Sequence, residues 1–487
     1  MSLSTALNIA QSALLATSRQ TSVVSRNVTN AGNTDYNRRL AMLQSDVPGI
    51  HMVSIQRAAD MSLFRANLGA VSSYEGQASL RTAIETMTQA VNGIDSASSP
   101  ATSIGALYEA LQFYAANPSN ASIAERAIDA ARQVVRSLNN GAAAVNAARS
   151  QADRNIAESV SDLNGLLAQF KTANDAVVSA TIGGRDASDQ LDQRDALLKR
   201  IAEHVPISTI TRDNNDMVIT TTSGTTLFET IPREVSFQAK LVYGATTVGN
   251  QVLVDGVPLP VGTGGDTDSA GRIAGYLQVR DQVAPTFQAQ LDEIARGLIS
   301  AFAETDQSGG ALPAQAGLFT WSGGPGLPAA GTVSPGLAGT ISINAAMDST
   351  VGGNAFVLRD GGANGVAYVA NTSGAASYSA LLLGYQAKLD EPMAFDGSAG
   401  AGVSASVMTY STNSISWLEG IRKSADQAEL TKSALVARTS EALSNATGVN
   451  VDQEMALLLE LEHSYGASAR LLKTVDEMLG TLLAMVD

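Results

Sequence analysis

Residues 451–486 read VDQEMALLLELEHSYGASARLLKTVDEMLGTLLAMV. Apolar side chains recur in this stretch three and four residues apart in strict alternation. Eight of nine such positions are apolar, and the nine are Leu458, Leu461, Tyr465, Ser468, Leu472, Val475, Leu479, Leu482 and Val486. This spacing is the seam of a coiled-coil-like helix. It predicts a helical rod of roughly 54 Å at 1.5 Å per residue.

A single helix with such a seam needs a partner, because isolated helices are marginally stable in water. The N-terminal segment offers one, since its side chains repeat at the same spacing at Leu3, Leu7, Ala10, Leu14, Thr17, Thr21, Val24 and Val28. We expect the two ends of the chain to pair. Several seam residues of the first helix are small or polar, so we also expect both ends to be mobile in the free subunit and to order on assembly.

The two ends carry opposite charge. Residues 1–60 hold five Arg against three Asp, a net of +2, and residues 449–487 hold two basic against seven acidic residues, a net of -5. Exposed charge pairs stabilise little but bias which surfaces meet. The alternative interpretation is that both sets of charges are solvated.

The interior of the chain predicts long helices interrupted by β-rich insertions. The predicted fold is multidomain and mainly α with β-rich insertions, with coiled-coil-like paired termini, an elongated helical bundle and an outer β-rich domain. The paired termini comprise residues 1–60 and 448–487. The bundle comprises residues 61–205, 268–305 and 373–447. The β-rich insertions comprise residues 206–267 and 306–372.

Element boundaries follow from breaks in these patterns. The first helix should end at residues 30–33, where Asn and Gly accept a left-handed backbone. An extended segment follows with a turn at Pro48-Gly49. Further helices are expected at 61–92, 104–116, 121–180, 188–204, 271–306, 377–389 and 403–446. Strands are expected at 207–261, with turns at residues 214–215, 223–224 and 255–256, and short strands at 340–369.

Composition narrows the class of protein. The net charge of -15 disfavours nucleic-acid binding, because an acidic surface repels phosphates. No cysteine is present, which excludes disulfides and thiolate metal sites. We expect neither a cleavable signal peptide nor a membrane-spanning stretch.

No catalytic, cofactor or metal constellation is recognisable. His51, His204 and His463 lack partners at metal-ligand spacing, and surface or packing roles are the better interpretation. Residues 213–216 lack the Gly and Glu of an EF-hand loop and predict a hairpin turn. Residues 400–405 match G-x-G-x-x-A, but no strand leads into them. The adjacent charges Arg194-Asp195 and Arg280-Asp281 are either solvated or intrahelical pairs, or polar contacts within or between subunits.

The two ends resemble the termini of bacterial flagellar axial proteins. The N-terminal signature is residues 27–39, NVTNAGNTDYNRR, in which Asp35 stands where the family usually has Gly. The C-terminal signature is GVNVDQEM at 448–455, with Asp452 as the expected helix N-cap. It continues at 464–470 and 474–483. The interior segments LDQRDALL (191–198) and GYLQVRD (275–281) resemble the hook-associated junction proteins of this family.

The resemblance implies a structural protein of the flagellum at the junction between hook and filament, and no enzyme. It implies secretion without signal cleavage through the flagellar type III apparatus and an extracellular location. The implied partners are further copies of the chain in a ring or helical layer, the hook protein, the second junction protein (hook-associated protein 3) and an export chaperone on the C-terminal helix. No cofactor is implied. The implied assembly interface comprises Leu3, Leu7, Leu14, Val24, Val28, Asn30, Tyr36, Leu458, Leu461, Tyr465, Leu472, Val475, Leu479 and Leu482.

Three other functions stay open. The chain could be a hook or rod subunit, although the interior helices count against it. The β-rich insertions could bind a surface or a glycan, although aromatic residues are only 5% of the chain. An enzyme domain within residues 206–369 would need a constellation that the sequence does not show.

Overall fold

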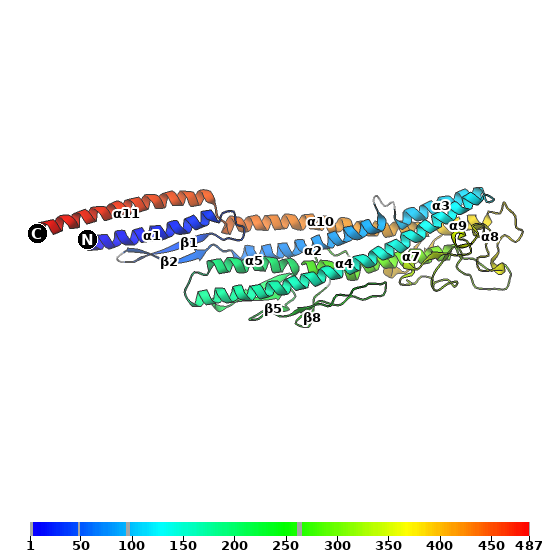
Figure 1. The fold of residues 1–487 in the computed structure, drawn as a ribbon, viewed down its shortest axis with the longest axis horizontal. Helices are drawn as coiled ribbons and strands as arrows, with labels where there is room; N and C mark the ends of the chain where they lie inside the picture. The colour runs from blue at the N-terminus through cyan, green and yellow to red at the C-terminus, as the bar shows by residue number, and fades with distance from the viewer. Residues whose placement is uncertain (1–2, 47–48, 94–97, 261–264, 487) are drawn as a thin grey trace.

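A computed structural model describes residues 3–46, 49–93, 98–260 and 265–486. The molecule is a long rod, and both termini lie at the same end of it (Figure 1). A slender part at this end contains α1 (Leu3–Thr29), the hairpin of β1 (Arg39–Asp46) and β2 (Gly49–Arg57), and α11 (Val451–Val486). The rest of the chain forms a thicker helical body. The prediction of a mainly helical fold with paired terminal helices and small β-insertions is confirmed.

Helices of very different length build most of the body. They are α2 (Met61–Asn92), α3 (Pro100–Ala116), α4 (Ala121–Ile182), α5 (Ser188–His204), α6 (Arg272–Gln278), a π-helical turn η3 (Val279–Val283), α7 (Ala284–Ala301), the single turn α8 (Val357–Asp360), α9 (Ala380–Asp390) and α10 (Val407–Thr447). The predicted bounds of the second and fifth helices, 61–92 and 188–204, agree with α2 and α5. The predicted start of α3 at Ile104 is wrong, because the Ser99 side chain accepts from the Thr102 amide and Pro100 fits the first turn.

All described strand pairs, including the β1–β2 hairpin, are antiparallel, and the strands outside this hairpin are short. One sheet has the order β3 (Ile207–Thr211), β4 (Met217–Thr221) and β5 (Thr226–Phe228), and a second has β6 (Val235–Ser236), β7 (Leu253–Val254) and β8 (Val257–Pro258). The remaining pairs are β9 (Phe319–Thr320) with β10 (Ser342–Ile343), and β11 (Met393–Ala394) with β12 (Ser404–Ala405).

The predicted turns at 214–215, 223–224 and 255–256 lie where expected. Asn214, Asn215 and Asp255 have positive φ angles of 56°, 61° and 50°, a conformation that Asn and Asp tolerate better than most residues. The expectation of strands over 340–369 is wrong apart from β10. That stretch folds into short helical turns and loops, which pack Ile341, Met347 and Leu358 onto the helical core. The predicted turn at Pro48-Gly49 includes residue 48, which lies outside the described residues.

Two hydrophobic cores follow one another along the body. Near the terminal end, the first part of α2 and the last part of α4 pack with α5, α6 and strands β3–β7, around Phe170, Leu198 and Phe228. Toward the far end, α3, the first half of α4, α7, α9 and the start of α10 pack around Phe287, Phe302 and Tyr385. Because α4 contributes to both cores, it joins the two ends of the body. Among the described residues, no helix is long and apolar enough to cross a membrane.

Candidate functional site

The paired termini are the first part of the candidate site. Helices α1 and α11 lie side by side and run in opposite directions (Figure 1). Near the body, Asn27 Nδ2 of α1 donates to Glu454 Oε2 of α11 at 3.0 Å. Val24, Leu461 and Val475 are buried in the pair. The predicted partnership of the two terminal helices is therefore present within one chain.

The predicted interface residues differ in how far they are covered. Buried are Val24, Tyr36, Leu461 and Val475. Partly buried are Leu7, Leu14, Val28, Asn30, Leu458, Leu472 and Leu479. Tyr465 occupies a seam position yet is 47% exposed, because two helices alone cover only a narrow stripe of each other. The side chains of Leu3 and Leu482 lie outside the described part of the chain.

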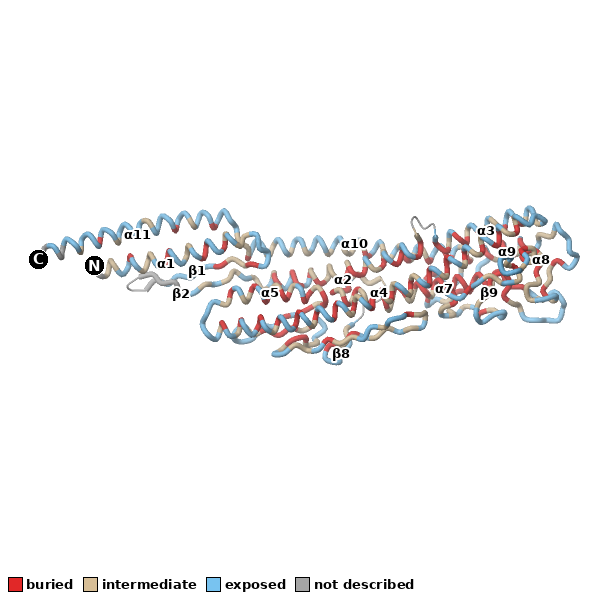
Figure 2. Tube along the Cα trace, in the orientation of Figure 1, coloured by how far each residue is buried: buried red, intermediate tan, exposed pale blue. Residues whose placement is uncertain are grey.

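A second row of apolar side chains on α11 is uncovered. Leu457, Leu471 and Met478 are 39%, 49% and 51% exposed, and they repeat at multiples of seven residues beside the seam. Figure 2 shows that most of α11 is exposed along its length. On α1, Leu15 is 58% exposed. Each terminal helix therefore retains apolar surface that its partner does not cover.

Asn27 ties the hairpin to both terminal helices. Its Oδ1 accepts hydrogen bonds from the Tyr36 hydroxyl at 2.8 Å and from the Arg39 amide at 2.9 Å. Its Nδ2 donates to the Arg39 carbonyl at 2.9 Å as well as to Glu454. The side chain is 1% exposed, so all four bonds form away from water. Asn27 opens the N-terminal signature, but side-chain type alone did not mark it as a site residue.

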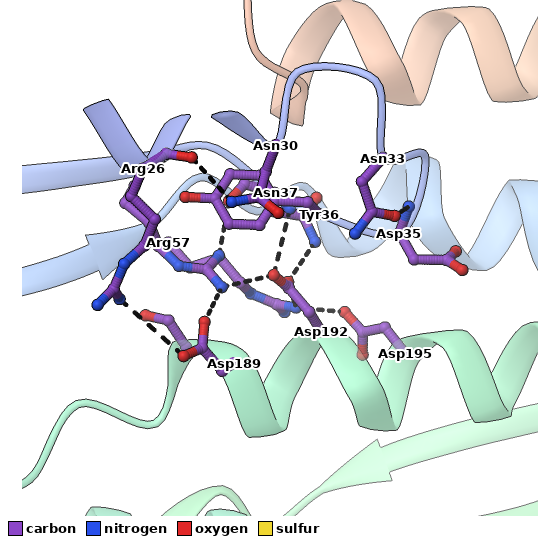
Figure 3. Close-up of polar contacts among 12 residues, drawn as sticks. Arg26, Asn30, Asn33, Asp35, Tyr36, Asn37, Arg57, Asp189, Asp192 and Asp195 are labelled. Atoms are coloured by element: carbon purple, nitrogen blue, oxygen red, sulfur yellow. Dashed lines mark hydrogen bonds and ion pairs between the residues drawn. The ribbon is translucent and has the colours of Figure 1, made fainter. Parts of the chain in front are cut away.

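An ionic cluster attaches the hairpin to α5 (Figure 3). We call Arg39, Arg57, Asp189, Asp192 and Asp195 the anchor cluster. Arg39 Nη2 lies 2.5 Å from Asp192 Oδ2 and 3.0 Å from Asp189 Oδ1. Arg57 Nη1 lies 3.1 Å from Asp192 Oδ1 and 2.6 Å from Asp195 Oδ2. The three carboxylates recur every third residue, which places them on one face of α5.

Most of the anchor cluster is shielded from water. The side chains of Arg39 and Arg57 are 1% and 8% exposed, and those of Asp192 and Asp195 are 10% exposed, whereas Asp189 is 69% exposed. Burial raises the pKa of Asp195 in spite of the neighbouring Arg57. Burial likewise raises the pKa of Tyr36, whose ring lies 4.5 Å below the Arg39 guanidinium. Buried pairs of this kind are costly to break from one side.

Helix α1 ends where predicted, but the turn that follows has a different backbone conformation from the one expected. No residue from Asn30 to Tyr36, all of them described, has a positive φ, so the expected left-handed residue is absent. Instead the Asn33 amide donates to the Asn30 carbonyl and the Asp35 amide to Asn33 Oδ1. The Asp35 carboxylate lies 2.9 Å from Lys199 Nζ on α5. Asp35 therefore supports the turn and adds a contact with the body.

The structure corrects the predicted N-cap of α11 and identifies the partners of Arg194 and Arg280. The N-cap of α11 is Asn450, whose Oδ1 accepts from the Gln453 amide at 3.1 Å, and not Asp452, which lies within the first helical turn. Arg194 does not pair with Asp195: it donates to Asn174 Oδ1 at 3.1 Å and to a backbone carbonyl. Arg280 binds both Asp281 and Asp153.

The opposite charges of the two ends do not meet in ion pairs. Among the described residues, no ion pair joins residues 1–60 to residues 449–486. Arg26, Arg39 and Arg57 pair with carboxylates of α5 instead, whereas Arg38 donates to Gln453 Oε1 of α11 at 3.5 Å. Three of the five arginines therefore attach the terminal part to the body.

The histidines have packing or surface positions where the structure describes them. His204 is 4% exposed, and burial lowers its pKa to about 4. His463 is exposed on α11, and the His51 side chain lies outside the described part. In the described ranges, no group of three or more His, Asp or Glu side chains is arranged to hold a metal ion.

The fold and the site define a class. A rod that carries its two termini paired at one end, with apolar rows left uncovered there, belongs to the class of subunits that build elongated assemblies. The family model described as "Flagellar hook-associated protein FlgK helical domain" matches residues 76–319, which is half of the chain. The model described as "Flagellar basal body rod FlgEFG protein C-terminal" matches residues 441–485.

The chain is also similar to individual proteins. The chain is 21% identical over 527 residues to flagellar hook-associated protein 1 of Bacillus subtilis (strain 168), covering 98% of this chain and 97% of that protein. The solved flagellar hook junction protein FlgK from Burkholderia pseudomallei aligns with a TM-score of 0.41 and 18% identity, over 53% of this chain and 47% of that one. The chain belongs to the FlgK family of flagellar hook-associated proteins, the structural proteins of the hook–filament junction.

Proposed function

We propose that the chain forms a layer of identical subunits between hook and filament, and that its paired termini α1 and α11 are the assembly module. The observation that carries this proposal is the exposed row of Leu457, Leu471 and Met478 beside a seam already occupied by α1. Exposed apolar rows of this kind are usually covered by a partner. Further copies of the same two helices fit, because they present the same spacing.

The anchor cluster supports separate roles for the terminal part and the helical body of the subunit. It joins the slender terminal part to the body through charged contacts, whereas each end of the body has its own apolar core. In the proposed arrangement the paired ends line the inner tube, the helical body forms the next shell and the insertions face outward. The subunit then acts as a mechanical connector without a catalytic role.

The partners in this proposal are those at the two faces of the junction. The hook protein lies on one side and hook-associated protein 3 on the other. Before assembly, an export chaperone covers α11, whose apolar row would otherwise contact water. Export through the flagellar type III apparatus then delivers the subunit to the extracellular flagellum.

Deletion of the gene in its own organism tests the proposed function. We expect intact hooks without filaments and filament subunits released into the medium, and restoration of filaments by the plasmid-borne full chain. Normal filaments in the deletion strain would contradict the proposal.

The weak pairing of the termini makes a second measurement informative. Hydrogen exchange of the dilute monomer should show rapid exchange along α1 and α11 and slow exchange in α4. The same amides should become protected in isolated flagella. Strong protection of the backbone amides of residues 458–482 in the monomer would contradict ordering on assembly.

A further inference from the structure

A hairpin-like loop on the flank of the body carries three strongly exposed aliphatic side chains. It comprises residues 237–250 of the segment that connects β6 with β7. Leu241, Val242 and Val248 are 92%, 78% and 77% exposed. Lys240 Nζ donates to the Val248 carbonyl at 2.6 Å, which brings the two arms of the loop together. The three aliphatic side chains therefore belong to one small surface, which we call the loop tip.

A buried polar clamp fixes this loop on the body. Asp153 of α4 accepts from the Tyr243 hydroxyl at 2.8 Å and from the Lys240 amide at 2.5 Å. The same carboxylate lies 2.5 Å from Arg280 Nη1, and its side chain is fully buried. Arg149 donates to the carbonyls of Gly244 and Thr247 at 3.1 and 2.6 Å.

The close approach of the loop to Arg280 explains why glycine occupies position 249. A Cβ atom at Gly249 would lie 2.4 Å from Arg280 Cζ, so only Gly allows this contact without movement. Arg280 Nη2 also donates to the Asn250 carbonyl at 2.7 Å. Contacts with Arg149, Asp153 and Arg280 therefore hold both arms of the loop, while its three aliphatic side chains stay exposed. A rigid apolar tip loses little conformational entropy on binding.

The opposite edge of the body offers a counterpart at the same level along the rod. In Figure 1 the insertions with β5 and β8 lie along one edge of the body, and α10 lies along the other. On α10, Leu430 is 71% exposed, and the adjacent Glu429 pairs with Arg81 of α2.

Contacts through the middle of the body fix this common level. Gly275 packs directly against Ser79 of α2, since a Cβ there would lie 2.3 Å from Ser79 Oγ. Arg280 follows five residues later, roughly 7.5 Å along the helix at 1.5 Å per residue, and contacts the clamp residue Asp153. The stretch of α2 that contacts Glu429 therefore lies level with the clamp and the loop.

We propose that, in the assembled layer, the loop tip of one copy packs against the exposed face of α10 around Leu430 of the next copy. The inference rests on the proposed function, because it needs copies placed side by side. Neighbours in a closed ring meet through two different surfaces, one on each flank, and because they are related by rotation alone these surfaces must lie at matching levels. The loop tip and Leu430 meet both conditions. Lateral contact in the body would supplement the terminal helices.

The absence of cysteine from the chain makes a direct test possible. The double variant L241C/L430C is expressed in the deletion strain, and isolated flagella are treated with a bis-maleimide cross-linker that spans about 10 Å, which relaxes the distance that a disulfide would demand. We expect a ladder of cross-linked multimers from flagella and none from the secreted monomer. A matched control, V366C/L430C, uses a valine that is 93% exposed elsewhere on the molecule.

The outcomes separate this inference from the proposed function. Incorporation of the double variant into flagella without a ladder would overturn the lateral contact and leave the junction function standing. An equal ladder from V366C/L430C would also overturn it, since the cross-linking would then be unspecific. A ladder confined to L241C/L430C supports the contact, and single L241C or L430C variants should give no product larger than a dimer.

Discussion

The Arg39 guanidinium of the terminal hairpin lies 2.5 Å from the Asp192 carboxylate of α5, and the Arg39 side chain is 1% exposed. This contact joins residues 153 positions apart in the chain. Its position means that the orientation of the paired ends depends on a buried charge pair. The consequences can be tested with single substitutions.

Asp192→Ala should loosen the hairpin from the body. It leaves Arg39 and Arg57 without their shared carboxylate, and breaking a buried pair from one side costs about 3–5 kcal/mol. Hydrogen exchange should show lower protection of β1 and β2 and unchanged protection of α4. Asp189→Ala is the matched control, because this exposed carboxylate binds the same arginine and should contribute less than about 1 kcal/mol. Equal effects of the two variants would contradict the assignment.

The N-cap of α11 can be distinguished from its neighbour by mutation. Asn450→Ala removes the acceptor for the Gln453 amide and should cost about 1 kcal/mol of helix stability. Asp452→Ala should cost only a few tenths of a kcal/mol, since its charge merely favours the helix N-terminus. Exchange rates of the first-turn amides measure the difference. A larger effect at residue 452 would restore the expectation from sequence.

Gly249→Ala should disturb the loop clamp through overpacking. The added methyl meets the Arg280 guanidinium and should destabilise the loop and its contacts by about 1–3 kcal/mol. Gly244→Ala is the control in the same loop, because its nearest neighbour would lie at an ordinary 3.7 Å. Urea unfolding of both variants provides the comparison. Equal midpoints would show that the loop does not rest on Arg280.

The stability of the protein should fall in acid through His204. Its pKa in the folded protein is about 4, below the usual 6.5, because it is buried and lies near Arg272. The unfolded chain therefore binds more protons between these values. The stability is fully present above pH 6.5 and is lost as pH falls toward 4, by about 3 kcal/mol. His204→Gln should lack this part of the pH dependence. The same pH dependence of the free energy of unfolding in the variant and the wild type would contradict the prediction.

Local patterns in the sequence predict the helices well for physical reasons. The three-and-four spacing of α11 and the apolar faces of α2 and α5 are properties of neighbouring residues. The turns at 214–215 and 255–256 follow from the tolerance of Asn, Asp and Gly for positive φ. The prediction of short strands over residues 340–369 was wrong, because apolar side chains that pack onto a core from a loop follow no regular spacing.

The candidate site was harder to predict, because it depends on contacts between distant segments. The spacing of the α5 carboxylates was visible, but nothing local indicated that Arg39 and Arg57 would meet them. The charge difference between the two ends suggested a direct attraction that the ion pairs do not show. The Asn450 cap was missed because Asn and Asp are about equally favourable N-caps by type, so only the observed start of α11 at Val451 distinguishes them.

Removal of α11 tests most directly whether the paired ends are the assembly module. A chain that stops before residue 451 should keep the helical body, with α4 protected in hydrogen exchange and cooperative thermal unfolding. Expressed in the deletion strain, it should be made and yet leave the cells with hooks and no filaments. Filaments in that strain would contradict the assembly role of α11, and collapse of the body would contradict its independence from the paired ends.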